Sequence, residues 1–316
     1  MTSVNKSELI GRNTSEIVTR DELNELLDQK TPPVTYCGYE VSGPVHIGTL
    51  VAVNKQLDFQ EAGLEVKVLF ADLHTYLNRK GDEGFIEEQV GIWTWVFKKF
   101  GLDKADYIRG TEFQYDRDYV HDVLSLGLST SLLRARRSMQ DIARDIENAK
   151  VSQMIYPLMQ AVDIKALGVD IAHGGMEQRK IHMLARELLP GIGYKKPVCI
   201  HTPLLCSLQG PESKMSSSKP ETLIKVDDSE SVIGEKLNSA YCPREAEGNP
   251  VMEMCKYLIF PRYGKLEIKR PIKYGGDVIY QTCEELENAY TTNELHPADL
   301  KKATAEKLIE LLEPFR

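Results

Sequence analysis

Between residues 34 and 202, short apolar runs alternate along the chain with longer amphipathic runs. The short runs are rich in β-branched and aromatic residues and predict strands that start at residue 34 and occupy residues 66–71, 106–110, 169–173 and 197–202. The longer runs place apolar residues at helical spacing, at residues 50–62, 82–100, 152–167 and 177–189. Because strands and helices alternate, the pattern predicts an α/β fold with a parallel sheet and right-handed crossovers.

Two regions depart from this alternation. Residues 116–148 are largely helical, and we interpret about 116–150 as an insertion into a first domain of residues 1–226. From residue 227 the predicted helices are short and capped, at residues 229–241, 249–259, 281–290 and 296–312, with a basic, strand-like stretch at 264–276. Residues 227–316 are therefore predicted to form a smaller, mostly helical domain. A further helix is expected at residues 19–29, where Thr19 and Glu22 have capping-box spacing.

Composition adds charge and compartment to this picture. The net charge of −8 and the isoelectric point of about 5.5 have the wrong sign for a general nucleic-acid binder, so any nucleic acid must bind local basic patches. We expect no membrane association, because no apolar segment is long enough to cross a bilayer and the N-terminus does not resemble a signal peptide. The six cysteines lie far apart without a Cys-x-x-Cys pair, which argues against a disulfide framework or a zinc site and favours a reducing, cytoplasmic compartment.

The first candidate for chemistry is the segment from residue 34 to residue 50. A strand-like start is followed by the turn Ser42-Gly43-Pro44 and by His46-Ile47-Gly48 at the head of an apolar-periodic run. A helix N-terminus offers backbone N–H groups and partial positive charge to a phosphate. Gly48 leaves room for close approach of a ligand. The alternative is an ordinary strand-to-helix turn with a surface histidine.

The second candidate is the run from Lys214 through Met215 and the three serines to Lys219. A lysine and three hydroxyls in a glycine-flanked loop can hold a polyphosphate. The alternative is a solvated Ser/Lys linker. Two features argue against a linker: the apolar residue Met215 within the run and the strand-like residues 198–202 before it.

Together these two segments resemble the signatures of the class I aminoacyl-tRNA synthetases, a His-Ile-Gly-His-like motif and a Lys-Met-Ser-Lys-Ser-like loop. The resemblance covers nearly the whole chain. Tyr36, residues 156–160, Asp163 and residues 174–187 are similar to the tyrosyl-tRNA synthetases of archaeal and eukaryotic type. The resemblance implies a Rossmann-like catalytic domain, a dimerising insertion, a mobile loop at about 210–220 and a C-terminal anticodon-binding domain. The implied partners are L-tyrosine, ATP, tRNA(Tyr) and a second copy of the chain.

In that family tyrosine is first activated by ATP and then transferred to the 3′ end of the tRNA. The resemblance implies that the phosphates meet the catalytic residues His46, Thr49, Lys214, Ser216, Ser217 and Ser218. Thr49 stands where the class has a second histidine, and Ser217 stands where it commonly has a second lysine. These departures leave open how much His46 and Lys214 each contribute to catalysis. We expect Mg²⁺ to be carried with ATP, since the sequence suggests no carboxylate cage and so no metal site of the protein itself.

The helical spacing at 152–167 places Tyr156, Gln160 and Asp163 on one face, which suits a polar pocket better than a core. The resemblance implies that Tyr156, Gln160 and Gln178 bind the ammonium group of tyrosine. It implies that Tyr36 and Asp163 meet its phenolic hydroxyl. The alternatives are an inward strand aromatic for Tyr36 and a solvated acid for Asp163. His74, at the carboxyl end of a predicted strand, either faces the substrate or is bonded within its loop.

For the ribose and adenine of ATP the resemblance implies Gly38, Gly174 and Glu177, with Gly48 at the phosphates. The alternative for Glu177 is an acid that favours a helix N-terminus. The tRNA candidates are Arg137, Arg179 and Lys180 for the acceptor stem and His296 and Asp299 for the anticodon. A helix start with a capping acid is the alternative for His296 and Asp299, and a solvated, salt-bridged helix is the alternative for the insertion.

Three other functions compete with this interpretation. A tryptophanyl-tRNA synthetase shares the fold and the signatures, but Tyr36 and Asp163 argue against it. A small-molecule nucleotidylyltransferase leaves residues 156–180 and the second domain unexplained. A non-catalytic RNA-binding paralogue would not need to keep His46, Lys214 and the pocket residues.

Overall fold

The computed structural model describes residues 6–142, 146–215 and 219–316. The chain divides into two compact units. Unit 1 consists of Met1–Ser42 and Lys55–Pro203, and unit 2 of Gly43–Asn54 and Leu204–Arg316. The expected boundary at residue 226 falls inside unit 2. The division into a catalytic and an anticodon-binding domain stays a prediction.

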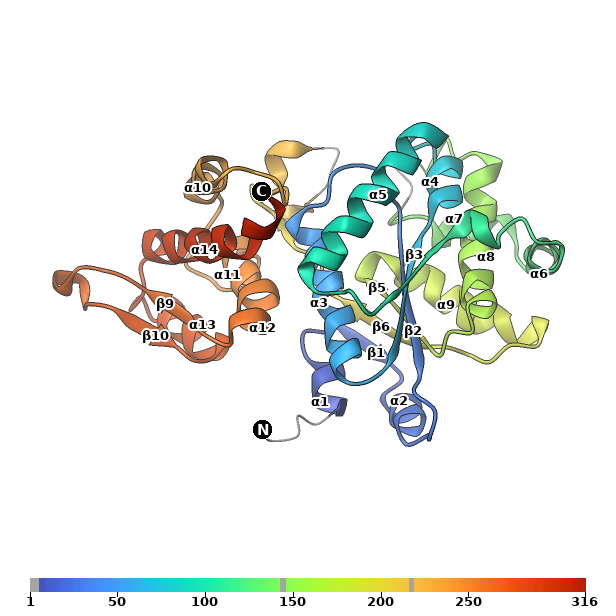
Figure 1. Cartoon of the computed structure of the whole chain (residues 1–316), viewed down its shortest axis with the longest axis horizontal. Helices are drawn as coiled ribbons and strands as arrows, with labels where there is room; N and C mark the ends of the chain where they lie inside the picture. The colour runs from blue at the N-terminus through green and yellow to red at the C-terminus, as the bar shows by residue number, and fades with distance from the viewer. Residues whose placement is uncertain (1–5, 143–145, 216–218) are drawn as a thin grey trace. The chain divides into compact units, whose positions relative to one another are not determined.

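A six-stranded sheet forms the centre of unit 1, with the strand order β1-β6-β5-β2-β3-β4 (Figure 1). The strands are β1 (Glu16–Val18), β2 (Val34–Tyr39), β3 (Glu65–Phe70), β4 (Asp106–Arg109), β5 (Ile171–Gly175) and β6 (Val198–Thr202). The five strands from β2 to β6 are parallel, which confirms the predicted sheet. The edge strand β1 pairs antiparallel with β6 and was not predicted.

Helices lie on both faces of this sheet. The helices of unit 1 are α1 (Lys6–Gly11), α2 (Arg20–Leu27), α3 (Ile47–Glu61, shared with unit 2), α4 (Asp72–Leu77), α5 (Glu83–Phe100), α6 (Arg117–Leu128), α7 (Leu132–Ser138), α8 (Val151–Ala166) and α9 (Arg179–Leu188). Phe59 of α3 packs edge-on against His173 of β5, whereas α9 packs against the neighbouring residue Ala172 on the opposite face.

Local sequence explains where these helices begin and end. Thr19 and Glu22 form the predicted capping box at the start of α2. Asp82 caps α5, and Gly101 ends it with a positive φ of 110° that favours glycine. Of residues 116–148, which are predicted to be largely helical, α6 and α7 form the helical part, and the role of this segment as an insertion stays a prediction.

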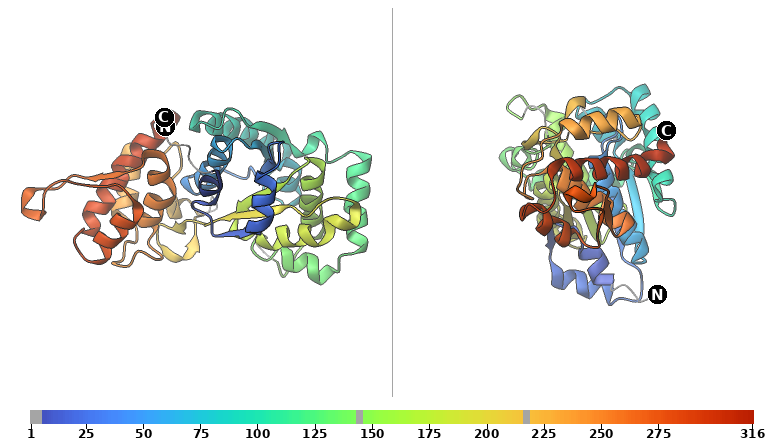
Figure 2. Two further views of the ribbon diagram at one scale, coloured as in Figure 1. Left: turned by 90° about the horizontal axis from the view of Figure 1, so that it is seen from below. Right: turned by 90° about the vertical axis from the view of Figure 1, so that its left-hand side faces the viewer.

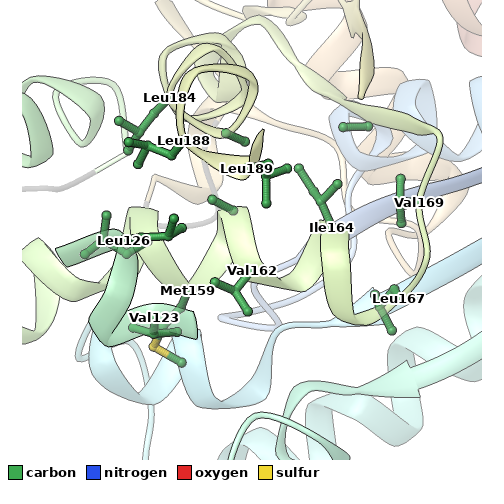
Figure 3. Packing of buried hydrophobic residues seen from close by; sticks show 14 of the residues in the cluster. Val123, Leu126, Met159, Val162, Ile164, Leu167, Val169, Leu184, Leu188 and Leu189 are labelled. Carbon is green, nitrogen blue, oxygen red and sulfur yellow. The ribbon is translucent and has the colours of Figure 1, made fainter. Parts of the chain in front are cut away.

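Helix α8 lies at the centre of an apolar cluster of unit 1. Val123 and Leu126 reach it from α6, and Leu184 and Leu188 reach it from α9 (Figure 3). The sheet adds Tyr36, Leu69, Ala172 and Cys199 to the same cluster. Such close packing on several sides fixes the position of α8 and of the polar side chains that it carries.

Unit 2 is mostly helical. Its helices are α10 (Glu230–Ser239), α11 (Pro250–Met254), α12 (Phe260–Tyr263), α13 (Cys283–Thr291) and α14 (Pro297–Leu312), and α14 packs against α10 and α11. The strands β9 (Leu266–Ile268) and β10 (Val278–Tyr280) form a hairpin that projects from these helices (Figure 2, orange). The predicted helices are confirmed, and the stretch predicted to be strand-like contains β9.

One expectation for unit 2 is wrong. Residues 210–214 were expected in a loop, but they form β8 (Gly210–Lys214), which pairs with β7 (Cys206–Ser207). The pairing partner lies only a few residues upstream, so the ribbon is local and Lys214 stands at its end. Among the described residues, no helix is long and apolar enough to cross a membrane.

Candidate active-site residues

The predicted polar face of α8 is confirmed in unit 1. Tyr156 and Asp163 are buried, and the amide of Gln160 donates to Oε1 of Gln178 at 3.1 Å. The ring of His74, on α4, packs edge-on against that of Tyr156 with centroids 4.5 Å apart. The structure thus brings together the side chains predicted for tyrosine from four separate segments of the chain.

Asp163 is held through one of its two carboxylate oxygens. Oδ1 accepts hydrogen bonds from Nε2 of Gln114 at 2.7 Å and from the hydroxyl of Tyr119 at 2.8 Å. Oδ2 lies 3.7 Å from Nε2 of His74, too far for a hydrogen bond. Burial raises the pKa of Asp163, and the nearby His74 and the two donors oppose this shift.

Several polar atoms around Asp163 are buried without a hydrogen-bond partner in the described part of the chain. They are the hydroxyl of Tyr36, Nε2 of His74, Oε1 of Gln160 and Oδ2 of Asp163. Each such atom costs about 1–3 kcal/mol if it stays unpaired. The arrangement is therefore suited to a ligand that can both donate and accept hydrogen bonds in this place.

The residues that hold Asp163 carry no sequence signal that marks them as part of a site. Gln114 follows the short helix at Gly110–Glu112 and belongs to no periodic run, so no pattern marks it. Tyr119 occupies a buried position of α6, where a tyrosine ring gives the same periodic signal as a leucine. Its spacing from Asp163 in three dimensions depends on the packing of α6 against α8.

The residues predicted for ribose and adenine have different local constraints. A β-carbon on Gly174 would lie 2.8 Å from Cγ of Gln178, so packing alone requires glycine there. A β-carbon on Gly38 would make ordinary contacts at 3.9 Å. Glu177 lies in the short helix Met176–Gln178, and its Oε2 atom is buried without a partner.

In unit 2, His46 folds back over the start of α3. Its Nδ1 atom accepts a hydrogen bond from the N–H of Gly48 at 3.1 Å, and a β-carbon on Gly48 would lie 2.8 Å from the ring. Burial lowers the pKa of His46 to about 4. At neutral pH the ring is therefore uncharged and presents Nε2–H as a donor.

The helix start itself differs from the expectation. The N–H of Ile47 donates to the carbonyl of Ile224, that of Gly48 to His46, and that of Thr49 to the carbonyl of His46. The idea that these groups are free for a phosphate is therefore wrong. The bond to Ile224 depends on a distant segment, so it could not be predicted from the local pattern.

The two signature segments meet within unit 2. A β-carbon on Gly48 would lie 3.7 Å from Cβ of Met215, which is itself buried. Lys214 is exposed at the end of β8, and no carboxylate of the described residues pairs with it. The predicted serines 216–218 lie outside the described residues.

The tRNA candidates are on the surface, and most of them have partners. Arg179 forms a two-point ion pair with Glu16, and Lys180 contacts Asp141 at 2.9 Å. Arg137 is exposed in the last turn of α7. His296 caps α14 by accepting from the N–H of Ala298, and Asp299 lies in the first turn. This geometry matches the alternative of a helix start with an acid in its first turn. The described residues contain no group of three His, Cys, Asp or Glu side chains able to hold a metal ion.

Comparisons with known proteins identify the family to which the chain is similar. Residues 28–313 match the family model of class I tRNA synthetases for tryptophan and tyrosine. Tyrosine–tRNA ligases of Methanopyrus kandleri and Methanocaldococcus jannaschii are each 52% identical over 311 residues, covering 98% of this chain and 95% and 98% of the relatives. The tyrosyl-tRNA synthetase of Archaeoglobus fulgidus, solved with L-tyrosine, is 50% identical with a TM-score of 0.95, covering 98% of this chain and 97% of that one.

Proposed function

Since the chain belongs to the family of class I tRNA synthetases for tryptophan and tyrosine, we infer that it is a tyrosine–tRNA ligase. In the first step the carboxylate of tyrosine attacks the α-phosphate of ATP, and pyrophosphate leaves. In the second step a hydroxyl of the 3′-terminal ribose of tRNA(Tyr) attacks the carbonyl carbon of tyrosyl-adenylate, and AMP leaves. Neither step needs a covalent bond to the protein, so catalysis depends on positioning and on charge stabilisation.

One observation supports tyrosine as the substrate above all others. Oδ2 of Asp163 and the hydroxyl of Tyr36 are both buried and both lack a partner. A phenolic hydroxyl can donate to the first and accept from the second. Phenylalanine would leave both unpaired, which is the physical basis for rejecting it.

In this proposal Tyr156, Gln160 and Gln178 bind the ammonium group of tyrosine. The bond between Gln160 and Gln178 orients the two amides and leaves the carbonyl oxygen of Gln160 without a partner. An amide carbonyl is a suitable acceptor for an ammonium group. Burial of Tyr156 raises the pKa of its hydroxyl well above the ordinary value, so it stays neutral and can accept as well.

Residues of unit 2 are proposed to bind the phosphates of ATP. His46 offers a neutral Nε2–H donor, and Lys214 offers an exposed positive charge one residue before Met215. Thr49 adds a hydroxyl, and Ser216, Ser217 and Ser218 complete the proposed set. Gly38, Gly174 and Glu177 are proposed for ribose and adenine. Mg²⁺ is proposed to arrive with ATP and to neutralise phosphate charge.

We propose Arg137, Arg179 and Lys180 for the acceptor end and His296 and Asp299 for the anticodon. The ion pairs of Arg179 and Lys180 are partly exposed, with 43% and 36% of the side chains accessible, so exchanging them for phosphate contacts costs less than it would for buried pairs. Because His296 and Asp299 lie in residues 227–316, these residues are proposed to form the anticodon-binding domain. We also propose a cytoplasmic location, because charging of tRNA serves translation and because the six cysteines are free thiols, as is usual in a reducing compartment.

A homodimer is proposed through the insertion. One face of α6, with Tyr119, Val123 and Leu126, is buried against unit 1. The opposite face and the start of α7 expose Val120, Leu124, Leu128, Leu132 and Leu133, three of them with more than 75% of the side chain accessible. These five exposed apolar residues, which we call the apolar stripe, support a self-complementary contact between two copies.

Amino-acid-dependent exchange between ATP and pyrophosphate tests the proposed function. The purified chain should catalyse exchange with tyrosine and with no other of the twenty amino acids, and it should charge tRNA(Tyr). Exchange that depends on tryptophan instead, or no exchange with any amino acid, would refute it.

A further inference from the structure

Gln114 makes the contact from which a further inference follows, and this inference rests on the proposed function. Its side-chain nitrogen lies 2.7 Å from Oδ1 of Asp163 and 3.3 Å from Nδ1 of His74. An ionised carboxylate can only accept hydrogen bonds, so the group that faces Oδ1 must be the NH₂ end of the amide. This settles the orientation of the amide by chemistry.

The same nitrogen then decides which nitrogen of His74 carries the proton. An amide NH₂ donates and does not accept, so Nδ1 of His74 must be the acceptor. A neutral imidazole that accepts at Nδ1 carries its proton on Nε2. His74 therefore presents Nε2–H, and this atom is one of those buried without a partner.

We propose that Gln114 is a positioning residue that fixes the Nε2–H form of His74, and that this N–H donates to the phenolic oxygen of the substrate. Asp163 supplies the complementary acceptor through Oδ2, 3.7 Å away. The substrate hydroxyl then donates to Asp163 and accepts from both His74 and Tyr36, because a hydroxyl oxygen has two lone pairs. An indole N–H can only donate, so tryptophan would leave the His74 proton unpaired.

The surroundings hold Gln114 in place for this task. A β-carbon on Gly110 would lie 2.4 Å from Oε1 of Gln114, so the side chain needs the space that glycine leaves. Asp72 accepts from the N–H of Thr111 at 3.0 Å and anchors the same turn. Tyr119 contacts Asp163 and the carbonyl of Met159 but not His74, so it holds the carboxylate without acting on the tautomer.

Two-bond ¹H–¹⁵N correlation spectra of the protein labelled with ¹⁵N-histidine read this tautomer directly. The chain has seven histidines, so the signals of His74 can be assigned by their loss in His74→Asn. Without substrate, wild-type His74 should show only the Nε2–H form. Gln114→Met, which keeps the shape and removes the donor, should show a mixture of both neutral forms. Tyr119→Phe should keep the wild-type form.

Steady-state exchange gives the matching kinetic result. Gln114→Met should raise the KM for tyrosine by about tenfold, the effect of one lost hydrogen bond, with kcat changed less than about twofold. Its preference for tyrosine over tryptophan should fall by a similar factor. Gln89→Met, the same change at a buried glutamine of α5 outside this network, should leave the KM for tyrosine unchanged.

An Nδ1–H form of His74 in the wild type would overturn the inference whether or not any variant folds. So would a Gln114→Met enzyme that folds and keeps both the tautomer and the wild-type KM. Because the wild-type spectrum needs no substrate, it decides the role of Gln114 separately from the exchange assay that tests the proposed function.

Discussion

Met215 lies directly against Gly48, so that a β-carbon at the glycine would be 3.7 Å from Cβ of the methionine. Backbone bonds from Ile47 to Ile224 and from Val226 to Val45 hold the surrounding segments together. The start of α3 and the end of β8 therefore form one local structure within unit 2. Lys214, the residue before Met215, extends from this structure with its charge exposed.

Replacing Lys214 by alanine should slow formation of tyrosyl-adenylate by about 10²–10³-fold, because a charge that stabilises the developing phosphate negative charge is lost. The equilibrium binding of tyrosine should change less than about twofold, since the amino-acid residues belong to unit 1. Stopped-flow adenylation and tyrosine titration measure the two effects. Lys302→Ala on the surface of α14 serves as the control, and an unchanged adenylation rate in Lys214→Ala would refute the role of the lysine.

Placing charges in the apolar stripe should separate the dimer. We expect Leu128→Glu combined with Leu132→Glu to sediment as a monomer of about 36 kDa at micromolar protein, where the wild type sediments as a dimer. Ile272→Glu, at an equally exposed isoleucine of unit 2, should stay dimeric. A monomeric wild type in sedimentation equilibrium would contradict the proposed assembly.

Lys55 ties the N-terminal segment to α3. Its ammonium group is buried and shares its three protons among four acceptors within hydrogen-bond distance, the carbonyls of Leu9, Ile10 and Arg12 and the carboxylate of Asp58, which also pairs with Arg12. Lys55→Met should lower the free energy of unfolding by about 3–5 kcal/mol, because Asp58 and three carbonyls lose a buried partner. Urea titration measures the loss, and Lys302→Met at an exposed site should change the free energy by less than about 0.5 kcal/mol.

His173 should make the fold sensitive to acid. Both of its ring nitrogens are buried without a partner, and burial, together with the charge of Lys55, lowers its pKa to about 3. The unfolded chain takes up this proton near pH 6.5, so wild-type stability is complete above that pH. It is lost as the pH falls toward 3, at up to about 1.4 kcal/mol per pH unit.

His173→Leu should remove this pH dependence. Between pH 7.5 and pH 5 the variant should lose about 2 kcal/mol less unfolding free energy than the wild type. At pH 7.5 it should be at least as stable, since two unpaired polar atoms are gone. Equal slopes of stability against pH in the two proteins would show that His173 is hydrated or paired.

The elements that could be predicted from the sequence are those whose signals are local. The capping-box spacing of Thr19 and Glu22 predicts the start of α2. The helical spacing of Tyr156, Gln160 and Asp163 predicts that they share one polar face of α8. Edge strand β1 escaped because three residues carry no periodic signal, and only their pairing with β6 makes them a strand. The donors to Asp163 escaped because Gln114 and Tyr119 come from a turn and a helix far from Asp163 in the chain.

Discrimination between tyrosine and phenylalanine tests the central claim most directly, because the claim is that Asp163 and Tyr36 bind the phenolic hydroxyl. The measurement is kcat/KM for both amino acids in ATP–pyrophosphate exchange, in the wild type and in Asp163→Ala combined with Tyr36→Leu. The wild type should prefer tyrosine by roughly 10⁴–10⁵, a ratio known for tyrosyl-tRNA synthetases rather than one calculated from this site. The folded double variant should use tyrosine far less well and lose most of that preference. A wild type that prefers tryptophan, or a double variant that keeps its preference for tyrosine, would contradict the claim.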